Sequence, residues 1–350
     1  MNRPAIADRL AWIAALLAGV AAAAGLGIGG LYRDAPFWAQ QARGIDLATL
    51  FLAVPILVVG LGTVRHGSLV GRLAAIAGLL YLIYNYAIFA FSVAMNPLAA
   101  VYIAILGLAV WSLVLSLSSA DLAGAGRALV GRLPRRTSVA VLLLVAALFG
   151  LLWLGQIATA TTTGTPPADL ARAGIPTNPV YALDLGLFLP LCVVAGVGLL
   201  RGARVAGAFA LPMLIWLFLT SAGIVGGFAF AALAGDDVPL VVAGVVGGVG
   251  IAAFLPAAVA VVRAGAREAR RSRRPNGGNR SMGPRADVAL DGSVRLRRTS
   301  CPRAAVEPET GFTLGSIRRP CSRGATSARR TGPRDAGAGH VQNGLPVAPL

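Results

Sequence analysis

Eight apolar runs, each about as long as a bilayer is thick, decide what this chain can fold into. A helix needs about 20 apolar residues to cross a hydrocarbon core of about 30 Å, and only helices and closed barrels satisfy their backbone polar groups there. The sequence therefore predicts an all-α polytopic membrane protein whose first partner is the lipid bilayer. The predicted spans are residues 10–31, 46–64, 73–94, 98–118, 138–157, 182–200, 205–233 and 238–262.

The first run follows two arginines, as the apolar core of a signal peptide does. A signal core has about 7 to 15 residues, whereas this run is longer, so we expect a retained first helix. The run also contains Gly25, Gly27 and Gly30, spaced as in a dinucleotide-binding loop. No strand precedes them, and glycines in a membrane helix usually let a neighbouring helix approach.

Arginines mark alternate loops between the runs. Sixteen of them, counted up to Arg274, fall on one side of the membrane in this threading and three on the other. Cytoplasmic loops carry the excess of basic residues, so both termini are predicted to be cytoplasmic.

The composition changes after residue 262. Residues 263–350 hold 18 arginines and six acidic residues, with much Pro, Gly, Ser and Ala and no apolar run. We expect a disordered cytoplasmic tail, or a segment translated from a shifted frame. The basic segment from Arg263 to Arg274 is predicted to lie on anionic headgroups. Nucleic acid is not an expected partner, because the tail lacks aromatic interleaving and a binding fold.

The two halves of the membrane region show a weak similarity. Phe89 and Phe91 correspond to Phe228 and Phe230, and Asp46 corresponds to Asp184. Four helices in each half would give two repeats with the same orientation, related by an axis along the membrane normal.

The two longer outer loops begin and end alike. Each is predicted to carry a short helix across the outer face, with Asp34 or Thr165 as N-cap and Gly44 or Gly174 as C-cap. Between the fourth and fifth spans, leucines share one face of residues 121–136. That loop is either a short interfacial helix ending before Pro134 or an unstructured basic loop.

Several classes of site are excluded. The membrane region holds one histidine, His66, and one cysteine, Cys192. Haem ligation by two histidines, zinc chemistry, paired-cysteine chemistry and disulfides therefore have no basis there. We predict no catalytic residue, no metal and no cofactor.

Aspartates gather near the outer interface. Asp46 and Asp184 lie about 25 to 29 Å from the arginines at the other end of their helices, at 1.5 Å per residue. They could attract cations or bind a cationic group, as repeat-related partners. Alternatively, they only cap helix N-termini, where a carboxylate stabilises the dipole.

The third span carries a polar stripe at mid-depth. Tyr81, Tyr84, Asn85 and Phe89 share one side of the helix. An unpartnered amide in hydrocarbon costs several kcal/mol, so Asn85 must face a helix or a cavity. Interhelical hydrogen bonding and a ligand pocket both remain open.

The seventh span offers partners for this stripe. Thr220 and Ser221 are the expected partners of Asn85, and together these residues give the candidate ligand-binding set Tyr81, Tyr84, Asn85, Asp46, Asp184, Thr220 and Ser221. In the same span Gly223 and Gly227, with Gly244 and Gly248 in the eighth, suggest that the last two spans pack closely. Tyr32, Trp38 and Tyr181, near helix ends, are expected in the interfacial belt.

The motif order Arg33-Asp34-x-Pro36, then Ala39 to Leu47, then Tyr81 to Tyr86 resembles uncharacterised multi-pass membrane proteins of high-GC bacteria. The resemblance covers residues 10–262 and implies a location in the bacterial inner (plasma) membrane, but no activity. Two functions are therefore weighed: a small-solute permease or transport-associated protein, with a polar cavity among the second, third, sixth and seventh spans, and a non-catalytic scaffold or regulatory subunit. A membrane enzyme ranks below both.

Overall fold

The computed structural model describes residues 3–129 and 131–272, except for the side chains of residues 169, 206 and 267–272. Residues 263–272, predicted as the start of a disordered tail, instead continue the last helix, and the prediction for residues 273–350 lies outside the described residues. Every regular element within them is helical. The α-helices are α1 (Arg3–Gly27), α2 (Pro36–Ala48), α3 (Val54–Val64), α4 (Leu69–Ser92), α5 (Ala99–Ser119), α6 (Leu122–Leu129), α7 (Arg135–Thr163), α8 (Ala168–Ala173), α9 (Pro179–Leu183), α10 (Leu189–Arg201), α11 (Arg204–Ala208), α12 (Ala210–Leu233) and α13 (Leu240–Ser272). The π-helices are η1 (Thr49–Ala53) and η2 (Asp184–Phe188).

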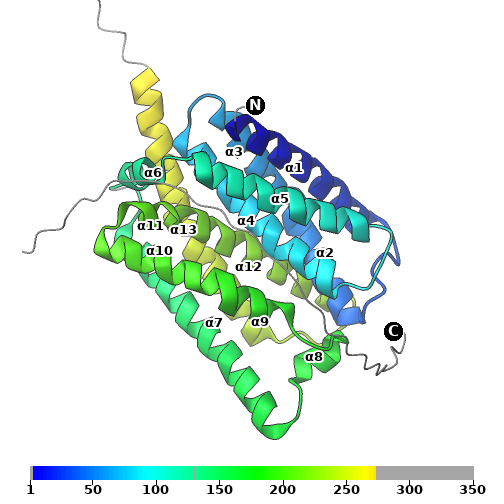
Figure 1. Ribbon diagram of the computed structural model, residues 1–350. Helices are drawn as coiled ribbons and strands as arrows, with labels where there is room; N and C mark the ends of the chain where they lie inside the picture. The colour runs from blue at the N-terminus through cyan, green and yellow to red at the C-terminus, as the bar shows by residue number, and fades with distance from the viewer. Residues whose placement is uncertain (1–2, 130, 273–350) are drawn as a thin grey trace, which may run out of the picture. The chain divides into compact units, whose positions relative to one another are not determined.

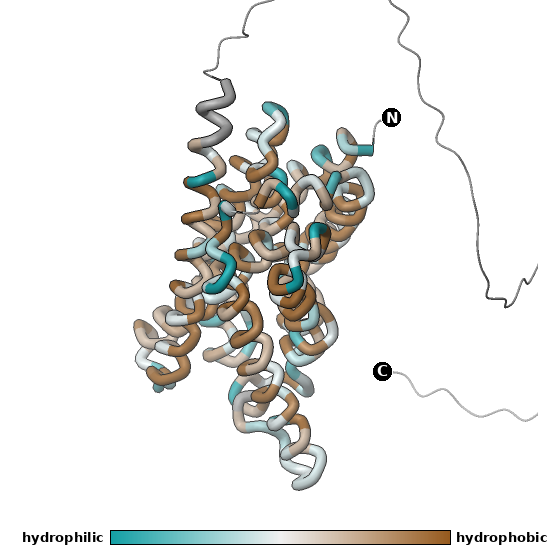
Figure 2. The backbone as a smooth tube through the Cα atoms, turned by 90° about the vertical axis from the view of Figure 1, so that its left-hand side faces the viewer, coloured by the Kyte–Doolittle hydropathy of each residue, from teal (hydrophilic) through white to brown (hydrophobic). Residues whose placement is uncertain are grey.

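Eight helices in the described part of the chain are long and apolar enough to cross a membrane. The shortest has 21 residues, or about 31 Å, which matches the hydrocarbon core. Hydrophobic residues dominate along the helices (Figure 2). The predicted all-α, eight-span fold is therefore confirmed, and lipid surrounds its outer faces.

The spans alternate in direction, so their loops gather at two ends of the bundle. We call the end with residues 28–35, 93–98, 164–178 and 234–239 the aspartate end, and the end with residues 65–68, 120–134 and 202–203 the arginine end. Figure 1 shows α1 and α5 side by side on one flank, α7 and α10 on the other, and α4 and α12 between them. The two central helices are the most buried spans.

The second span begins ten residues earlier than predicted. α2, η1 and α3 form one continuous helix from Pro36 to Val64, so the separate helix expected across the outer face before Gly44 is wrong. Gly44 does not cap a helix. Its missing side chain instead lets the backbone of α12 approach, since a Cβ there would lie 1.9 Å from the nitrogen of Gly227.

The capping prediction for Asp34 is also wrong. Ala35 is the N-cap of α2, and Asp34 Oδ1 instead accepts a hydrogen bond of 2.8 Å from the backbone nitrogen of Ala94, in the loop before α5. Burial raises the pKa of Asp34, against the lowering effect of this bond. Asp34 thus joins two loops rather than starting a helix.

The second outer loop does hold a separate helix, α8, which ends at Gly174 with a left-handed φ of 68°. Its N-cap is Pro167 rather than the expected Thr165. The guanidinium of Arg172 lies 4.1 Å from the ring centroid of Phe37 in α2, and it also donates to the carbonyl of Asp237. At the arginine end, residues 122–129 form the short helix α6, with Pro134 as N-cap of α7. Of the two alternatives for this loop, the short helix is therefore found and the unstructured loop is not.

The two halves share an architecture, but not the expected alignment. Each has a span interrupted by a five-residue π-helix and followed by a buried 24-residue helix, α4 or α12. η1 begins at Thr49 and η2 begins at Asp184. When the two halves are aligned on their π-helices, Asp184 corresponds to Thr49 and not to Asp46. The expected alignment was therefore displaced by about one helical turn.

Candidate functional site

The carboxylate of Asp184 is buried where the second half meets α4. Its side chain is 6% exposed, and both oxygens accept hydrogen bonds from aromatic residues. The hydroxyl of Tyr84 donates to Oδ1 at 3.0 Å, and the indole Nε1 of Trp153 in α7 donates to Oδ2 at 2.8 Å. Asp184 therefore ties together helices from both halves and does not cap a helix that begins in solvent.

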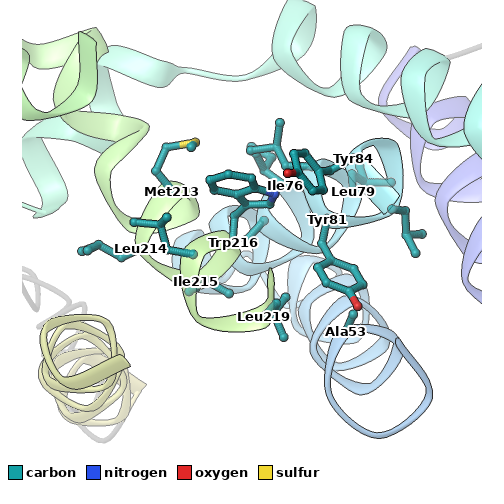
Figure 3. Close-up of a cluster of buried hydrophobic side chains, with 14 of the residues drawn as sticks. Ala53, Ile76, Leu79, Tyr81, Tyr84, Met213, Leu214, Ile215, Trp216 and Leu219 are labelled. Atoms are coloured by element: carbon teal, nitrogen blue, oxygen red, sulfur yellow. The ribbon is translucent and has the colours of Figure 1, made fainter. Parts of the chain in front are cut away.

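Aromatic rings pack around this carboxylate. The ring of Tyr84 meets Phe188 edge to face at 4.9 Å and Trp216 at 5.3 Å between centroids, and Phe188 stacks on Trp216 at 4.5 Å. Figure 3 shows Trp216 of α12 beside Tyr84 of α4. On the other side, the ring of Trp153 lies 5.1 Å from that of Tyr181.

The carboxylate of Asp46 occupies a second buried position, 2% exposed, inside α2. Its Oδ2 accepts a hydrogen bond from the hydroxyl of Tyr32. The helix α1 can approach this pair only because residue 25 is glycine. A Cβ there would lie 1.9 Å from Asp46 Oδ2 and 2.6 Å from the Tyr32 oxygen. The N-capping alternative is therefore wrong for Asp46, which lies ten residues inside its helix.

Tyr81 of α4 contacts the first residue of the first π-helix, Thr49. Its hydroxyl donates to the carbonyl of Ile45 at 3.1 Å and lies 3.2 Å from the hydroxyl of Thr49, which donates to the same carbonyl at 2.8 Å. The irregular turn thus places additional hydrogen bonds on one carbonyl. π-Helical turns inside α-helices occur frequently at functional sites.

Asn85 does not reach the partners expected for it. The side chain is 2% exposed, and its Nδ2 donates to the carbonyl of Tyr81 in its own helix at 3.0 Å. Within the described residues, Thr220 Oγ1 is buried without a hydrogen-bond partner, and Ser221 faces α13, where a Cβ on Gly250 would lie 2.8 Å from its Cβ. The structure therefore joins Tyr84 with Asp184, and Tyr81 with α2, but leaves Asn85, Thr220 and Ser221 apart.

The glycines of the last two spans pack differently from the prediction. Gly223 and Gly227 contact α2 rather than α13. The predicted proximity of α12 and α13 is found, but Gly247 and Gly250 form the contact in place of Gly244 and Gly248.

Neither buried aspartate has a cationic partner in contact among the described residues. The one ion pair that we find there joins Arg127 to Asp121 at 3.5 Å, at the exposed arginine end. The charge of Arg43 interacts with Asp46 electrostatically, but the two side chains are too far apart to form a direct ion pair. Buried charges are normally paired or coordinated, so these two carboxylates are the most unusual electrostatic feature of the bundle.

Two cavities lie at the arginine end of the described chain. One of about 230 Å³ is lined by Ser68, Arg72, Ile76 and Asp121, and another of about 650 Å³ lies between the start of α7 and Leu200. Neither touches the buried aspartates. Between α4, η2 and α12, three of the elements that would line the predicted cavity, the rings of Tyr84, Phe188 and Trp216 pack on one another.

Four aromatic residues of this site could not be identified from the sequence. Their order along the chain places Tyr32 and Tyr181 in an interfacial belt and indicates no role for Trp153 and Trp216. One signal was available for Trp216, because it precedes Thr220 by four residues and so shares its face of α12. No such signal was available for Trp153, because the residue that it bonds, Asp184, is 31 residues away in another span.

We expect Gly25→Ala to push Asp46 and Tyr32 apart, whereas Gly27→Ala should be tolerated. The second glycine is two residues away in the same helix, and nothing lies within 4 Å of the position that a Cβ would take there. Because the side chain of Asp46 can move, the expected loss is about 1 kcal/mol relative to Gly27→Ala. Thermal unfolding of both variants in detergent measures it, and equal melting temperatures would contradict the Asp46 geometry.

Comparison with family models, curated proteins and solved structures gave no match to the chain. Its assignment therefore rests on its own helices and their apolar surfaces, which make it a multi-pass integral membrane protein with two buried aspartates.

Proposed function

We propose that this protein is a small-solute permease in which Asp46 and Asp184 take part in binding the solute. The observation that carries the proposal is that both carboxylates are buried within membrane spans, are bonded by neutral aromatic donors and lack a contacting cation in the described part of the chain. Ionisable residues within membrane spans are costly and commonly mark substrate or ion pathways.

The placement of these groups supports transport over catalysis. Asp46, Tyr81, Tyr84, Asp184 and Trp216 come from four spans, two of which, α4 and α12, form the centre of the bundle. They join the two halves, as substrate sites do in transporters built from repeats. The distribution of arginines favours cytoplasmic termini, and the resemblance to proteins of high-GC bacteria favours the inner membrane. The arginines from Arg263 onward would then bind anionic headgroups.

Uptake into proteoliposomes tests the proposal. The full-length protein is reconstituted and supplied with radiolabelled alanine, glucose, methylamine and benzyltrimethylammonium. We expect uptake of at least one probe above that of protein-free liposomes, and a decrease of about tenfold in Asp46→Asn and in Asp184→Asn. Loss of one charge-assisted contact is worth about 1.5 to 3 kcal/mol.

Asp237→Asn is the matched control, because this side chain is exposed in the loop before α13. It should transport as the unaltered protein does. If no probe enters, or if uptake by both buried-aspartate variants equals that of the unaltered protein, the permease proposal is wrong and the scaffold or regulatory function is favoured. The close glycine contact between α2 and α12 is the observation that favours this alternative.

A further inference from the structure

Five aromatic side chains form a connected group at Asp184, and we call them the aromatic group: Tyr84, Trp153, Tyr181, Phe188 and Trp216. Tyr84 and Trp153 bond the carboxylate directly. The other three rings lie 4.5 to 5.3 Å from a neighbour within the group, measured between centroids. The faces of aromatic rings attract cations, and Trp does so most strongly.

No basic side chain of the described residues would balance a charge on Asp184. Both carboxylate oxygens accept from neutral donors, which suits the ionised form, and no basic side chain of the described residues lies within 4 Å. A cation placed among the rings would be attracted both by the carboxylate and by the ring faces. Asp46 accepts from one aromatic donor, Tyr32, whose ring stacks on Phe89 at 6.0 Å between centroids, whereas Asp184 accepts from two.

A second observation independently points to a ligand. The indole Nε1 of Trp216 is buried without a hydrogen-bond partner among the described residues, in a side chain that is 2% exposed and packed on both Phe188 and Tyr84. Buried indole N–H groups usually find an acceptor. The indole N–H is therefore free to donate to an acceptor that a ligand or a water molecule brings to the group.

The helix that supplies Trp153 also gives the site a route to the bilayer. All buried residues of α7 lie at or before Ala146, and the second half of the helix is largely exposed, with Leu151 72% exposed. This half is bonded to other elements through Trp153 and through Gln156, which accepts from Tyr181. Few contacts therefore have to break for the second half of α7 to move away from η2 and open the aromatic group toward lipid, while its first half stays packed on α10.

We propose that Asp184 and the aromatic group bind a hydrophobic organic cation, namely an amine or quaternary ammonium with apolar or aromatic substituents, which enters from the bilayer beside α7. This inference rests on the proposed permease function and specifies its class of solute. Asp184 neutralises the cation, the ring faces of Trp153 and Trp216 contact its substituents, and the Trp216 indole donates to any acceptor that the ligand carries.

The test uses benzyltrimethylammonium, whose fixed charge separates cation binding from protonation of Asp184. The full-length protein in lipid nanodiscs is titrated by isothermal calorimetry, and the signal of empty nanodiscs is subtracted. We expect saturable binding that weakens about tenfold in Asp184→Asn and roughly threefold in Trp216→Phe, which keeps a ring in the stack but removes the indole. Trp111→Phe is the control, because Trp111 is exposed on the outer face of α5, and its binding should be unchanged.

Binding that is absent, or that is equal in Asp184→Asn and the unaltered protein, would overturn the inference. If gel filtration shows that Asp184→Asn does not assemble, the inference is tested by comparing the benzyltrimethylammonium affinities of Trp216→Phe and Trp111→Phe. Equal affinities of those two variants would overturn it as well. Uptake of alanine or glucose that depends on the aspartates, without ammonium binding, would refute this inference and retain the permease. Ammonium binding without uptake of any probe would retain the site and refute the permease.

Discussion

Gly44→Ala is expected to prevent normal assembly of the bundle, because α2 and α12 meet there backbone to backbone. A Cβ on residue 44 would lie 1.9 Å from the nitrogen and 2.4 Å from the Cα of Gly227, and 2.5 Å from the carbonyl oxygen of Gly223. Backbone atoms cannot turn aside as a side-chain end can. The two helices would have to separate, which we expect to lower the free energy of unfolding by about 3 kcal/mol.

Gly62→Ala is the matched control for this variant. Gly62 lies in the same continuous span, and nothing is within 4 Å of the position of a Cβ there. Alanine in a helix interior is favoured over glycine by about 0.5 to 1 kcal/mol, so this change should be neutral or stabilising. Thermal unfolding in detergent, with yield after gel filtration, compares the two. A Gly44→Ala variant as stable as Gly62→Ala would contradict the contact between the halves.

Gly126→Ala should have a comparable effect at the arginine end. A Cβ on this residue of α6 would lie 1.6 Å from the carbonyl oxygen of Arg204, so α6 and α11 would have to part. We expect a loss of about 3 kcal/mol. The same carbonyl belongs to the segment that leads into α12, and α12 carries Trp216. The variant should therefore also bind less benzyltrimethylammonium in total, in proportion to the loss of folded protein.

The control here is Gly107→Ala in α5, where nothing lies within 4 Å of a Cβ. Its melting temperature should equal or exceed that of the unaltered protein. If Gly126→Ala melts at the same temperature as Gly107→Ala, the close approach of α6 and α11 is not part of the folded protein.

The spans could be predicted because the bilayer imposes a length and an apolar composition on each helix separately. Positions 73–94 and 205–233, for example, lie within four residues of the ends of α4 and five of those of α12. The start of the second span could not be predicted in this way. Arg43 and Asp46 suggested a loop, yet burial of Asp46 against Tyr32 and of Gly44 against Gly227 keeps that stretch helical.

Four residues of the candidate site could be chosen from the sequence, but their contacts could not. Tyr81, Tyr84, Asp46 and Asp184 stood out because polar groups are rare among apolar residues. Their pairing depends on the rotation and depth of each helix relative to its neighbours, which a sequence of this kind does not encode locally. Asn85 illustrates the limit, since a carbonyl four residues earlier in its own helix accepts its hydrogen bond.

The length of α7 has a consequence for the site that Trp153 helps to form. Its 29 residues extend about 44 Å, well beyond a hydrocarbon core of about 30 Å. The apolar stretch that has to match the core, residues 138–157, spans about 30 Å, and a bilayer thinner or thicker than this tilts the helix or is itself deformed, at a modest free-energy cost per ångström. Membrane thickness therefore affects the tilt of α7, the helix whose Trp153 bonds Asp184. The same protein placed in thin and thick bilayers would hold that indole at different angles to the carboxylate.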